Sequence, residues 1–236
     1  DPNIGVVPIP DSRLNVIQEH IKTQKVIPAA LELVDIAGLV RGASTGEGKG
    51  NAFLGHIKDV DAIIQVVRCF VKAPGGEDIT HVDGSVDPLR DIETIELELI
   101  LADIQTLENA EAKAKRNAKG GDRDAIARMK VIEQLLPVLE AQKPARSLEF
   151  NDPDLIKAVK GLALITTKPI LYIANVTDDD PNGEGELAQR VREHAESVGA
   201  EMVPVCARIE SELSELDEED KIEMLADMGM DEPALG

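Results

Sequence analysis

An apolar run near the start of the chain ends in one carboxylate, and its surroundings could take part in phosphate chemistry. Residues 33–40 read Leu-Val-Asp-Ile-Ala-Gly-Leu-Val, so Asp35 and Gly38 form an Asp-x-x-Gly pattern. Phosphate-handling α/β proteins present a carboxylate to Mg²⁺ at the C-terminal end of an apolar strand. A glycine at position 38 would let the backbone approach a terminal phosphate closely, because no Cβ intrudes. Those four residues alone, however, are more often a strand that runs into an ordinary glycine-rich turn.

The loop after this run is unusually rich in small residues. Five glycines lie between positions 38 and 50, and the loop extends from Arg41 to Asn51. A loop of this composition can adopt more than one conformation, as a nucleotide-dependent switch must. The loop therefore favours the phosphate interpretation over the simple turn.

Blocks of sequence around and beyond this loop occur in order along the chain. The longest, V-D-I-A-G-L-V-x-G-A-S-x-G-E-G-x-G-N, occupies residues 34–51. The others are D-P-N-x-G-V-V-P at 1–8, V-V-R-C-F at 66–70, D-P-L-x-D-I at 87–92, K-G-G-D at 119–122, Y-I-A-N-V at 172–176 and V-P-V-C-A at 203–207. Together they closely resemble the YchF/Obg-like ATPase family over essentially the whole chain.

The resemblance assigns roles to the first block, which corresponds to the second switch of that family. Asp35 would hold Mg²⁺ through a coordinated water, and Gly38 would offer its backbone N–H to the γ-phosphate. Leu39 occupies the position where Ras-like enzymes keep a water-orienting Gln. Since an aliphatic side chain cannot hydrogen-bond that water, hydrolysis should be slow or need water positioned by other groups or a partner.

The resemblance also identifies a base-reading motif at residues 175–178. Asn175, Val176 and Asp178 correspond to the N-K-x-D of GTPases, whose Asp accepts from guanine N1–H and the N2 amine. The family usually has a non-Lys second residue and Glu at the fourth position, and accepts ATP. This chain keeps the first feature and departs from the second, which leaves the preference for ATP or GTP open. Cys206 and Ala207 are expected to meet the base through backbone groups.

Alternating strand-like and helix-like segments indicate an α/β fold with a mostly parallel sheet. The strand-like runs are 4–10, 25–34, 62–70, 169–176 and 200–207, and helices are expected at 12–21, 51–59, 152–161, 187–197 and 210–230. The resemblance makes this a P-loop NTPase-type sheet flanked by helices, with an inserted α-helical antiparallel coiled-coil hairpin. The expected domains are an OBG-type G domain from 1–90 and 151–236, and the hairpin from 91–150.

The hairpin is predicted from two long amphipathic segments. Residues 91–119 contain no Gly or Pro, Gly120-Gly121 breaks them, and Asp122 can cap a second helix that Pro137 should kink. A stripe at steps of three and four predicts the packed face of the first helix: Leu97, Leu101, Ile104, Leu107, Ala110 and Ala114.

The end of the hairpin has a distinct charge. Between positions 113 and 130, seven basic side chains face two acidic ones, a net charge of +5. The basic residues are Lys113, Lys115, Arg116, Lys119, Arg123, Arg128 and Lys130. One interpretation is an ordinary solvated helix end. The other is an arm that presents positive charge to an anionic partner such as ribosomal RNA.

The bulk composition limits the class of protein. The formal charge of −20 over 236 residues argues against a chain that coats nucleic acid as a whole, and no DNA partner is expected. Cys69 and Cys206 lie in apolar runs without metal-ligand spacing, which indicates buried free thiols in a reducing compartment. No apolar stretch approaches the roughly 20 residues that span a membrane, so we expect no membrane partner and a cytoplasmic protein.

The chain contains no G-x-x-x-x-G-K-[ST] phosphate loop. In the family that loop and a Mg²⁺-binding Thr lie upstream of the D-P-N block, and a TGS domain follows downstream, so we expect an internal piece of a longer protein. The resemblance implies a Mg²⁺-dependent, slow ATPase with some GTP use, associated with ribosomes in stress or translation control. The alternatives are a non-catalytic ribosome- or RNA-interaction module and an Obg-type GTPase.

Overall fold

Two short sheets carry the strands of the chain. The computed structural model describes residues 3–9, 11–21, 23, 25–35, 55, 57–72 and 84–227. The chain divides into two compact units, residues 1–38 and residues 39–235. The predicted switch residues Gly38 and Leu39, and the loop that follows them, lie outside the described residues.

The first unit is built on an antiparallel strand pair. β1 (Asn3–Pro8) pairs with β2 (Ala30–Asp35), with Asn3 opposite Asp35, and α1 (Arg13–His20) connects them. The expected strand–helix–strand order is confirmed, but the second strand begins at Ala30 and not at residue 25. Pro28, two residues earlier, has no N–H to donate to a ladder.

The second unit contains a three-stranded parallel sheet in the order β3-β4-β5. Its strands are β3 (Ile63–Arg68), β4 (Ile170–Asn175) and β5 (Glu201–Val205). The α/β fold with parallel strands that the sequence predicted is confirmed. Because the strands run in one direction, their C-terminal ends all lie at the same edge of the sheet.

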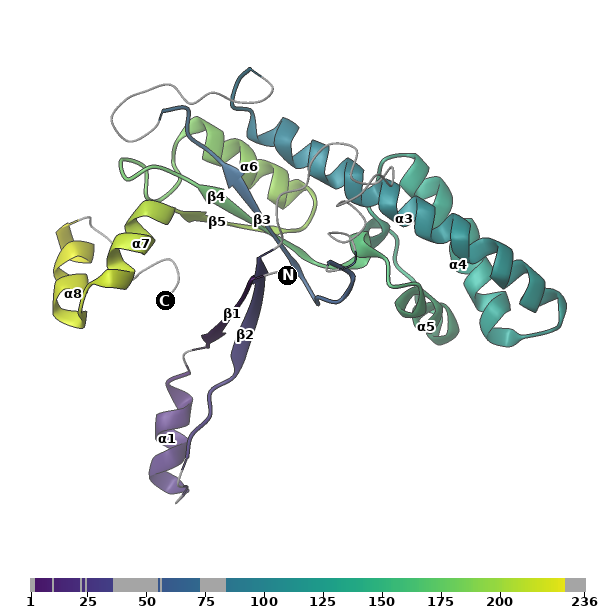
Figure 1. Cartoon of the computed structure of the whole chain (residues 1–236), viewed down its shortest axis with the longest axis horizontal. Coiled ribbons are helices and arrows are strands. Elements are labelled where there is room, and N and C mark those ends of the chain that lie inside the picture. The colour runs from purple at the N-terminus through teal and green to yellow at the C-terminus, as the bar shows by residue number, and fades with distance from the viewer. Residues whose placement is uncertain are drawn as a thin grey trace. The chain divides into compact units, whose positions relative to one another are not determined.

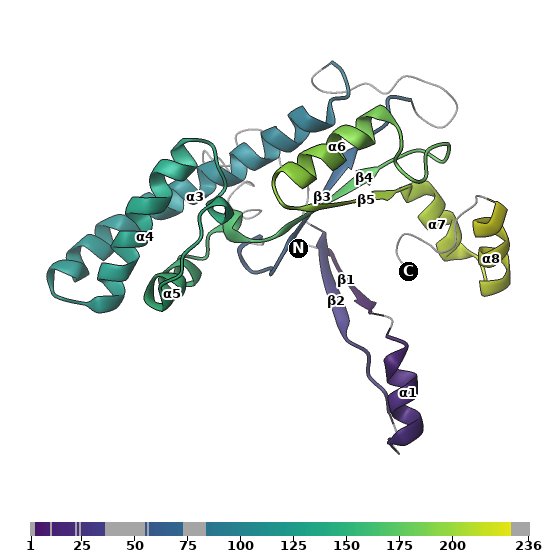
Figure 2. The ribbon, with the colours of Figure 1, turned by 180° about the vertical axis from the view of Figure 1, so that it is seen from behind.

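Two helices cover one face of this sheet. α3 (Pro88–Lys119) and α6 (Glu186–Ser197) lie side by side over it in both views (Figures 1 and 2). Between helices and sheet lies an aliphatic core with one aromatic ring, formed by Val67, Ile92, Tyr172, Val191 and Ala195. These side chains therefore pack the strands against the first half of α3.

The second half of α3 forms the predicted helical hairpin with α4 (Arg123–Glu140). Gly121 turns the chain with a φ of +81°, a backbone conformation that favours glycine. The Asp122 carboxylate accepts from the backbone N–H groups of Asp124 and Ala125 at 3.0 and 3.3 Å, as expected of a helix cap. The first helix starts at Pro88, three residues before the predicted residue 91, because Asp87 caps it.

The predicted stripe on α3 is partly wrong. Leu107 and Ala114 are buried as expected, but Leu97 and Leu101 are each 39% exposed. Leu99, Ile100 and Asp103 are buried in their place. The reason is that α3 contacts the sheet, α6 and α4 in turn along its length, so no single stripe describes its packed surface.

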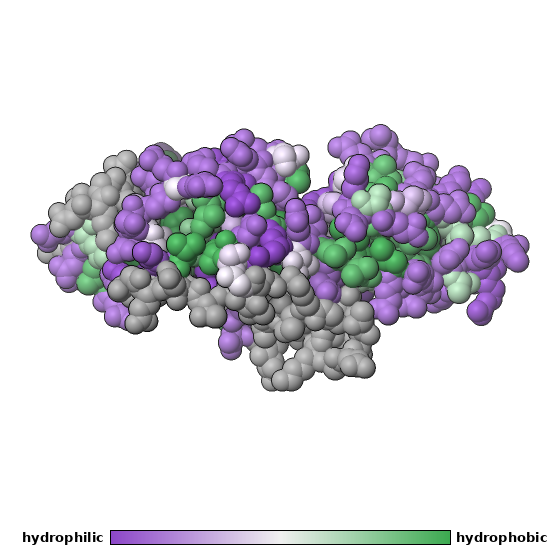
Figure 3. All heavy atoms as spheres, turned by 90° about the horizontal axis from the view of Figure 1, so that it is seen from above, coloured by the Kyte–Doolittle hydropathy of each residue, from purple (hydrophilic) through white to green (hydrophobic). Residues whose placement is uncertain are grey.

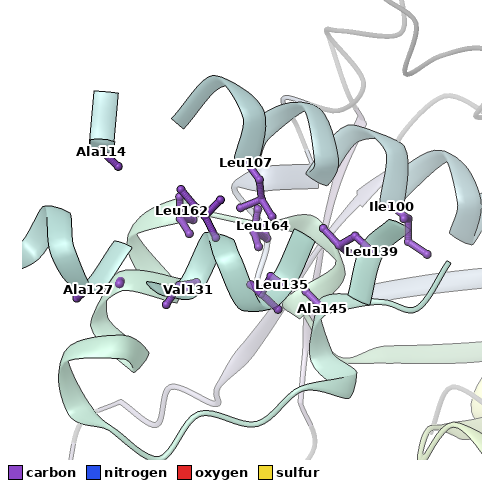
Figure 4. Packing of buried hydrophobic residues seen from close by; sticks show 12 residues of the cluster. Ile100, Leu107, Ala114, Ala127, Val131, Leu135, Leu139, Ala145, Leu162 and Leu164 are labelled. Carbon is purple, nitrogen blue, oxygen red and sulfur yellow. The ribbon is translucent and has the colours of Figure 1, made fainter. Parts of the chain in front are cut away.

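The core of the hairpin also includes the segments that follow it. Buried side chains of α3 and α4 pack with those of α5 (Pro153–Leu162) and of the short helices η2 (Ala145–Ser147) and η3 (Ile165–Thr167). Figure 4 shows Leu107, Leu135, Leu139, Leu162 and Leu164 in this cluster. The domain division at residues 90 and 150 stays a prediction.

The single helix expected at residues 210–230 is instead two, which corrects that prediction. α7 (Ala207–Glu215) ends before Asp217, and α8 (Glu218–Asp227) begins after it. The Asp217 carboxylate accepts from the backbone N–H of Asp220 at 3.1 Å, so it starts a new helix where the first one stops. Among the described residues, no helix is both long and apolar enough to cross a membrane.

Candidate nucleotide-binding site

The candidate site lies where β4 and β5 end. Asn175 is the last residue of β4 and pairs in register with Val205, the last residue of β5. The loop after β4 carries Asp178, and α7 begins directly after Cys206. In open α/β sheets, ligands bind outside the carboxyl ends of the strands. The structure therefore brings the residues predicted from two distant blocks to one edge of the sheet.

Asn175 connects three segments at this edge. Its side-chain oxygen accepts a hydrogen bond from the backbone N–H of Ala207, with 3.4 Å between oxygen and nitrogen. Its backbone carbonyl accepts from the N–H of Cys69 at 2.9 Å, just after β3 ends. The structure thus brings Asn175 and Ala207, two of the predicted site residues, into contact, and their contact with a base stays a prediction.

Asp178 is held by a residue that the sequence did not single out. The Arg208 guanidinium donates from Nη2 to Oδ2 of Asp178 at 2.9 Å, and its Nε lies 3.2 Å from an oxygen of Glu212. Both partners of the first pair remain about half exposed. Arg208 follows Ala207 directly, but only the fold brings it to a carboxylate 30 residues away. Its position next to Ala207, a predicted site residue, was the only indication in the sequence that Arg208 belongs to the site.

Two of the predicted site residues are buried, so their side chains can only hold the surrounding segments in place. Val176 is 3% exposed and Cys206 is 6% exposed, and both pack in one cluster with Ile209 and Leu213 of α7. The Val176 N–H donates to the Val205 carbonyl at 3.0 Å, which continues the ladder past the strand. A buried aliphatic residue here fixes the loop after β4 to α7.

The whole chain has close relatives of known name. Over 235 residues, all of this chain, it is 50% identical to the ribosome-binding ATPase YchF of Pasteurella multocida. It is 48% identical over 238 residues to the protein of the same name from Bacillus subtilis. The solved structure of the Schizosaccharomyces pombe YchF GTPase matches 98% of this chain and 62% of its own, with a TM-score of 0.79 at 32% identity. Over its whole length, the chain is similar to these YchF proteins.

The resemblance that the sequence blocks indicated is therefore confirmed, together with the P-loop GTPase-type fold. The chain spans 63% of the length of both bacterial relatives. No protein-family model matches the chain. The names of the YchF relatives differ in one respect, since the bacterial proteins are called ATPases and the S. pombe protein a GTPase.

The loop between β4 and α6 is fixed by its own contacts. The Asp180 carboxylate accepts from the backbone N–H groups of Glu184 and Gly185 at 2.7 and 3.0 Å. Gly183 has a φ of +64°, and a Cβ at this position would lie 2.8 Å from the Cβ of Pro204. The loop that carries Asp178 is thus held in one conformation by its own contacts, and it leaves no space for a side chain at Gly183.

The two thiols behave as the sequence predicted for buried groups. Cys206 is buried and Cys69 is partly buried, and neither forms a disulfide. Burial, together with the negative charge of Asp180, raises the pKa of the Cys69 thiol to about 12. Cys69 is therefore a neutral thiol at physiological pH and a poor nucleophile.

The metal prediction depends on Asp35 alone. Asp35 is exposed at the end of β2, in the first unit. Within the described ranges, no group of three or more His, Cys, Asp or Glu side chains could hold a metal ion. A single exposed carboxylate fits a contact to Mg²⁺ through a coordinated water, because Mg²⁺ usually keeps several of its waters.

Proposed function

We propose that this chain forms most of a Mg²⁺-dependent nucleotide switch and that the base of ATP binds at the C-terminal edge of β4 and β5. In the complete protein it would hydrolyse ATP slowly, with GTP as a second substrate. The observation that carries this proposal is the junction of Asn175, Asp178 and Ala207 at that edge. This junction combines a side-chain amide, a carboxylate and a helix N-terminus, whose donors and acceptors would pair with those of a purine base.

Three residues near β2 would serve the phosphate end of the nucleotide. Asp35 would hold a Mg²⁺-bound water, Gly38 would donate its N–H to the γ-phosphate, and Leu39 would stand beside the attacking water. Mg²⁺ would neutralise charge on the phosphate oxygens when bound. Since Leu39 has no polar atom to orient water, the proposed hydrolysis is slow without a partner.

The proposed partner is the ribosome, in the cytoplasm, and the proposed contact is the end of the hairpin. Six of its seven basic side chains are exposed and the seventh, Arg128, is half-buried. One of its two carboxylates, on Asp124, is paired with Lys157 of α5 at 3.0 Å, which adds a positive charge beside it. On the right side of Figure 3, hydrophilic side chains surround an area of hydrophobic ones. The relatives' name, ribosome-binding ATPase, supports this partner.

The base site is tested by nucleotide binding to the complete protein, measured by isothermal titration calorimetry with Mg²⁺-ADP and Mg²⁺-GDP. Asp178→Ala should weaken binding of the preferred nucleotide by about tenfold, the typical effect of losing a hydrogen bond to a charged group. Asp179→Ala is the matched control, because it removes the same charge from the next position of the same loop. Unchanged affinity of Asp178→Ala for both nucleotides would refute the base site.

A second candidate function is a non-catalytic module that binds ribosomes or RNA, which the net charge of +5 at the hairpin end favours. An Obg-type GTPase is the alternative within the enzyme class. The two nucleotides in the calorimetric experiment separate these cases: a module binds neither, and an Obg-type GTPase prefers GDP.

A further inference from the structure

We propose that Arg208 makes the base site prefer adenine. Without Arg208, the carboxylate of Asp178 would accept two hydrogen bonds from a base. With the ion pair, the two side chains together offer one donor and one acceptor. This inference rests on the proposed function, since it names the group that selects the base at the proposed site. The relatives, called ATPase in two cases and GTPase in the third, leave that selection undecided.

The geometry of the pair starts from α7. Arg208 is the second residue of that helix and follows Ala207, whose N–H is bound by Asn175. From there its guanidinium contacts two carboxylates, that of Asp178 at 2.9 Å through Nη2 and that of Glu212 at 3.2 Å through Nε. Glu212 lies one turn further along the same helix and holds the guanidinium at a second point. The planar group is therefore placed beside the carboxylate that would read the base.

The two purines present different edges to this pair. Guanine offers two adjacent donors, N1–H and the N2 amine, and a free carboxylate with two acceptor oxygens matches both. Adenine offers an acceptor at N1 and a donor at its N6 amine. An ionised carboxylate has acceptors only, whereas a guanidinium has donors only. Asp178 alone therefore suits guanine, while Asp178 and Arg208 together suit adenine.

The contacts of Arg208 leave donors for a base. A guanidinium carries five N–H groups, and the ion pairs found within the described residues use Nη2 for Asp178 and Nε for Glu212. The side chains of Arg208 and Asp178 are 48% and 44% exposed, so a base can reach both. An N–H of Arg208 would then donate to adenine N1 while an oxygen of Asp178 accepts from the N6 amine.

Guanine meets the same pair unfavourably. Its N1–H would face an N–H of Arg208, donor against donor, and one Asp178 oxygen is already engaged. Guanine could bind only after Arg208 leaves the carboxylate. Because an exposed ion pair is weak, this displacement is feasible, so GTP would be disfavoured and not excluded. The pair thus accounts for a site that prefers adenine but tolerates guanine.

The test uses the complete protein and the ratio of dissociation constants for Mg²⁺-GDP and Mg²⁺-ADP on one sample. This ratio does not depend on the fraction of folded protein, so partial unfolding of a variant does not disturb it. Arg208→Ala should lower the ratio by about tenfold, because adenine loses a donor and guanine regains both acceptors. Arg190→Ala is the matched control, since Arg190 forms another half-exposed pair with an aspartate, Asp87, at 3.1 Å. The control should leave the ratio unchanged.

A second experiment tests whether Arg208 donates a hydrogen bond to N1 of adenine. 1-Deaza-ADP lacks the N1 acceptor, so wild-type protein should bind it about tenfold more weakly than ADP. Arg208→Ala should bind the two nucleotides equally. If wild-type protein binds ADP or GDP but neither Arg208→Ala nor 1-deaza-ADP changes the preference, the role of Arg208 is overturned and the proposed function stands. If wild-type protein binds neither nucleotide, the proposed function fails and this inference fails with it.

Discussion

The side-chain oxygen of Asn175 and the backbone N–H of Ala207 are joined by a hydrogen bond of 3.4 Å between residues 32 positions apart. The contact ties the end of β4 to the first turn of α7. The backbone carbonyl of Asn175 also accepts from Cys69 after β3, so one residue holds the ends of three segments. Asn175 thus fixes this edge of the sheet, and we propose that it also binds the base.

Replacement of Asn175 should reveal both roles. We expect Asn175→Ala to lower the free energy of unfolding by about 1 kcal/mol, since one side-chain hydrogen bond is lost. Nucleotide affinity should fall by about tenfold, because the amide no longer reads the base. Urea denaturation and calorimetry measure the two effects. Asn117→Ala, at an exposed position on α3, is the control and should leave both unchanged.

Asp103 should be the most sensitive polar position outside the site. It is fully buried and accepts hydrogen bonds from the backbone of Ile165 at 2.8 Å, and from the backbone and the hydroxyl of Thr166 at 2.7 Å each. Asp103→Ala leaves these donors buried without an acceptor, so we expect a loss of about 2–4 kcal/mol in unfolding free energy. A loss below about 0.5 kcal/mol in urea denaturation would contradict the role of this residue in joining α3 to η3.

The same carboxyl should give stability an unusual pH dependence. Burial raises the pKa of Asp103 above its ordinary 3.8, although its hydrogen bonds to Thr166 and Ile165 and the charge of Lys58 act in the opposite direction. The folded state therefore holds this proton more tightly than the unfolded state does. Its contribution is fully present below pH 3.8 and is lost as the pH rises through the raised pKa. Asp103→Asn cannot titrate, so the stability of wild-type protein relative to this variant should fall with rising pH, and a rise would contradict the assignment.

The end of the hairpin should carry ribosome binding. Lys115→Glu with Lys119→Glu reverses two exposed charges there, and we expect cosedimentation with ribosomes to weaken by about tenfold or more at low salt. Lys72→Glu with Lys143→Glu changes the net charge equally at exposed positions outside the hairpin end and outside α5, and it should have little effect. Equal weakening by both pairs would show that only the overall charge matters.

Gly183 offers a test of the loop that carries Asp178. We expect Gly183→Ala to destabilise the fold by about 2–3 kcal/mol, from a positive φ and from contact with Pro204. Gly199→Ala is its matched control, because Gly199 also has a positive φ, +68°, but has open space around its Cβ position. Gly199→Ala should cost only about 1 kcal/mol. Equal losses in thermal unfolding would show that the packing against Pro204 is unimportant.

The sequence was most informative where local chemistry determines the structure. Gly121 and Asp122 predicted the hairpin turn and its cap, because a positive φ and a side-chain cap are properties of single residues. The parallel strands were visible as apolar runs. Leu97 and Leu101 were placed wrongly, since which side of a long helix is buried depends on its neighbours in space.

The candidate site was only partly predictable for the same reason. The motif around Asn175 and the position of Ala207 came from ordered blocks, and the fold brings them together. The pair of Asp178 with Arg208 could not be read from the sequence, because it joins an exposed side chain of a loop to one of a helix 30 residues further along the chain. Such a contact has no periodicity and no spacing rule.

The most direct test of the central claim is hydrogen–deuterium exchange of the complete protein with and without saturating Mg²⁺-ADP. If the base binds at the ends of β4 and β5, amide exchange should slow in the segments 175–180 and 206–210, while the end of the hairpin at 113–130 should not change. Protection confined to other segments, in protein that binds the nucleotide, would contradict the placement of the base at this edge of the sheet.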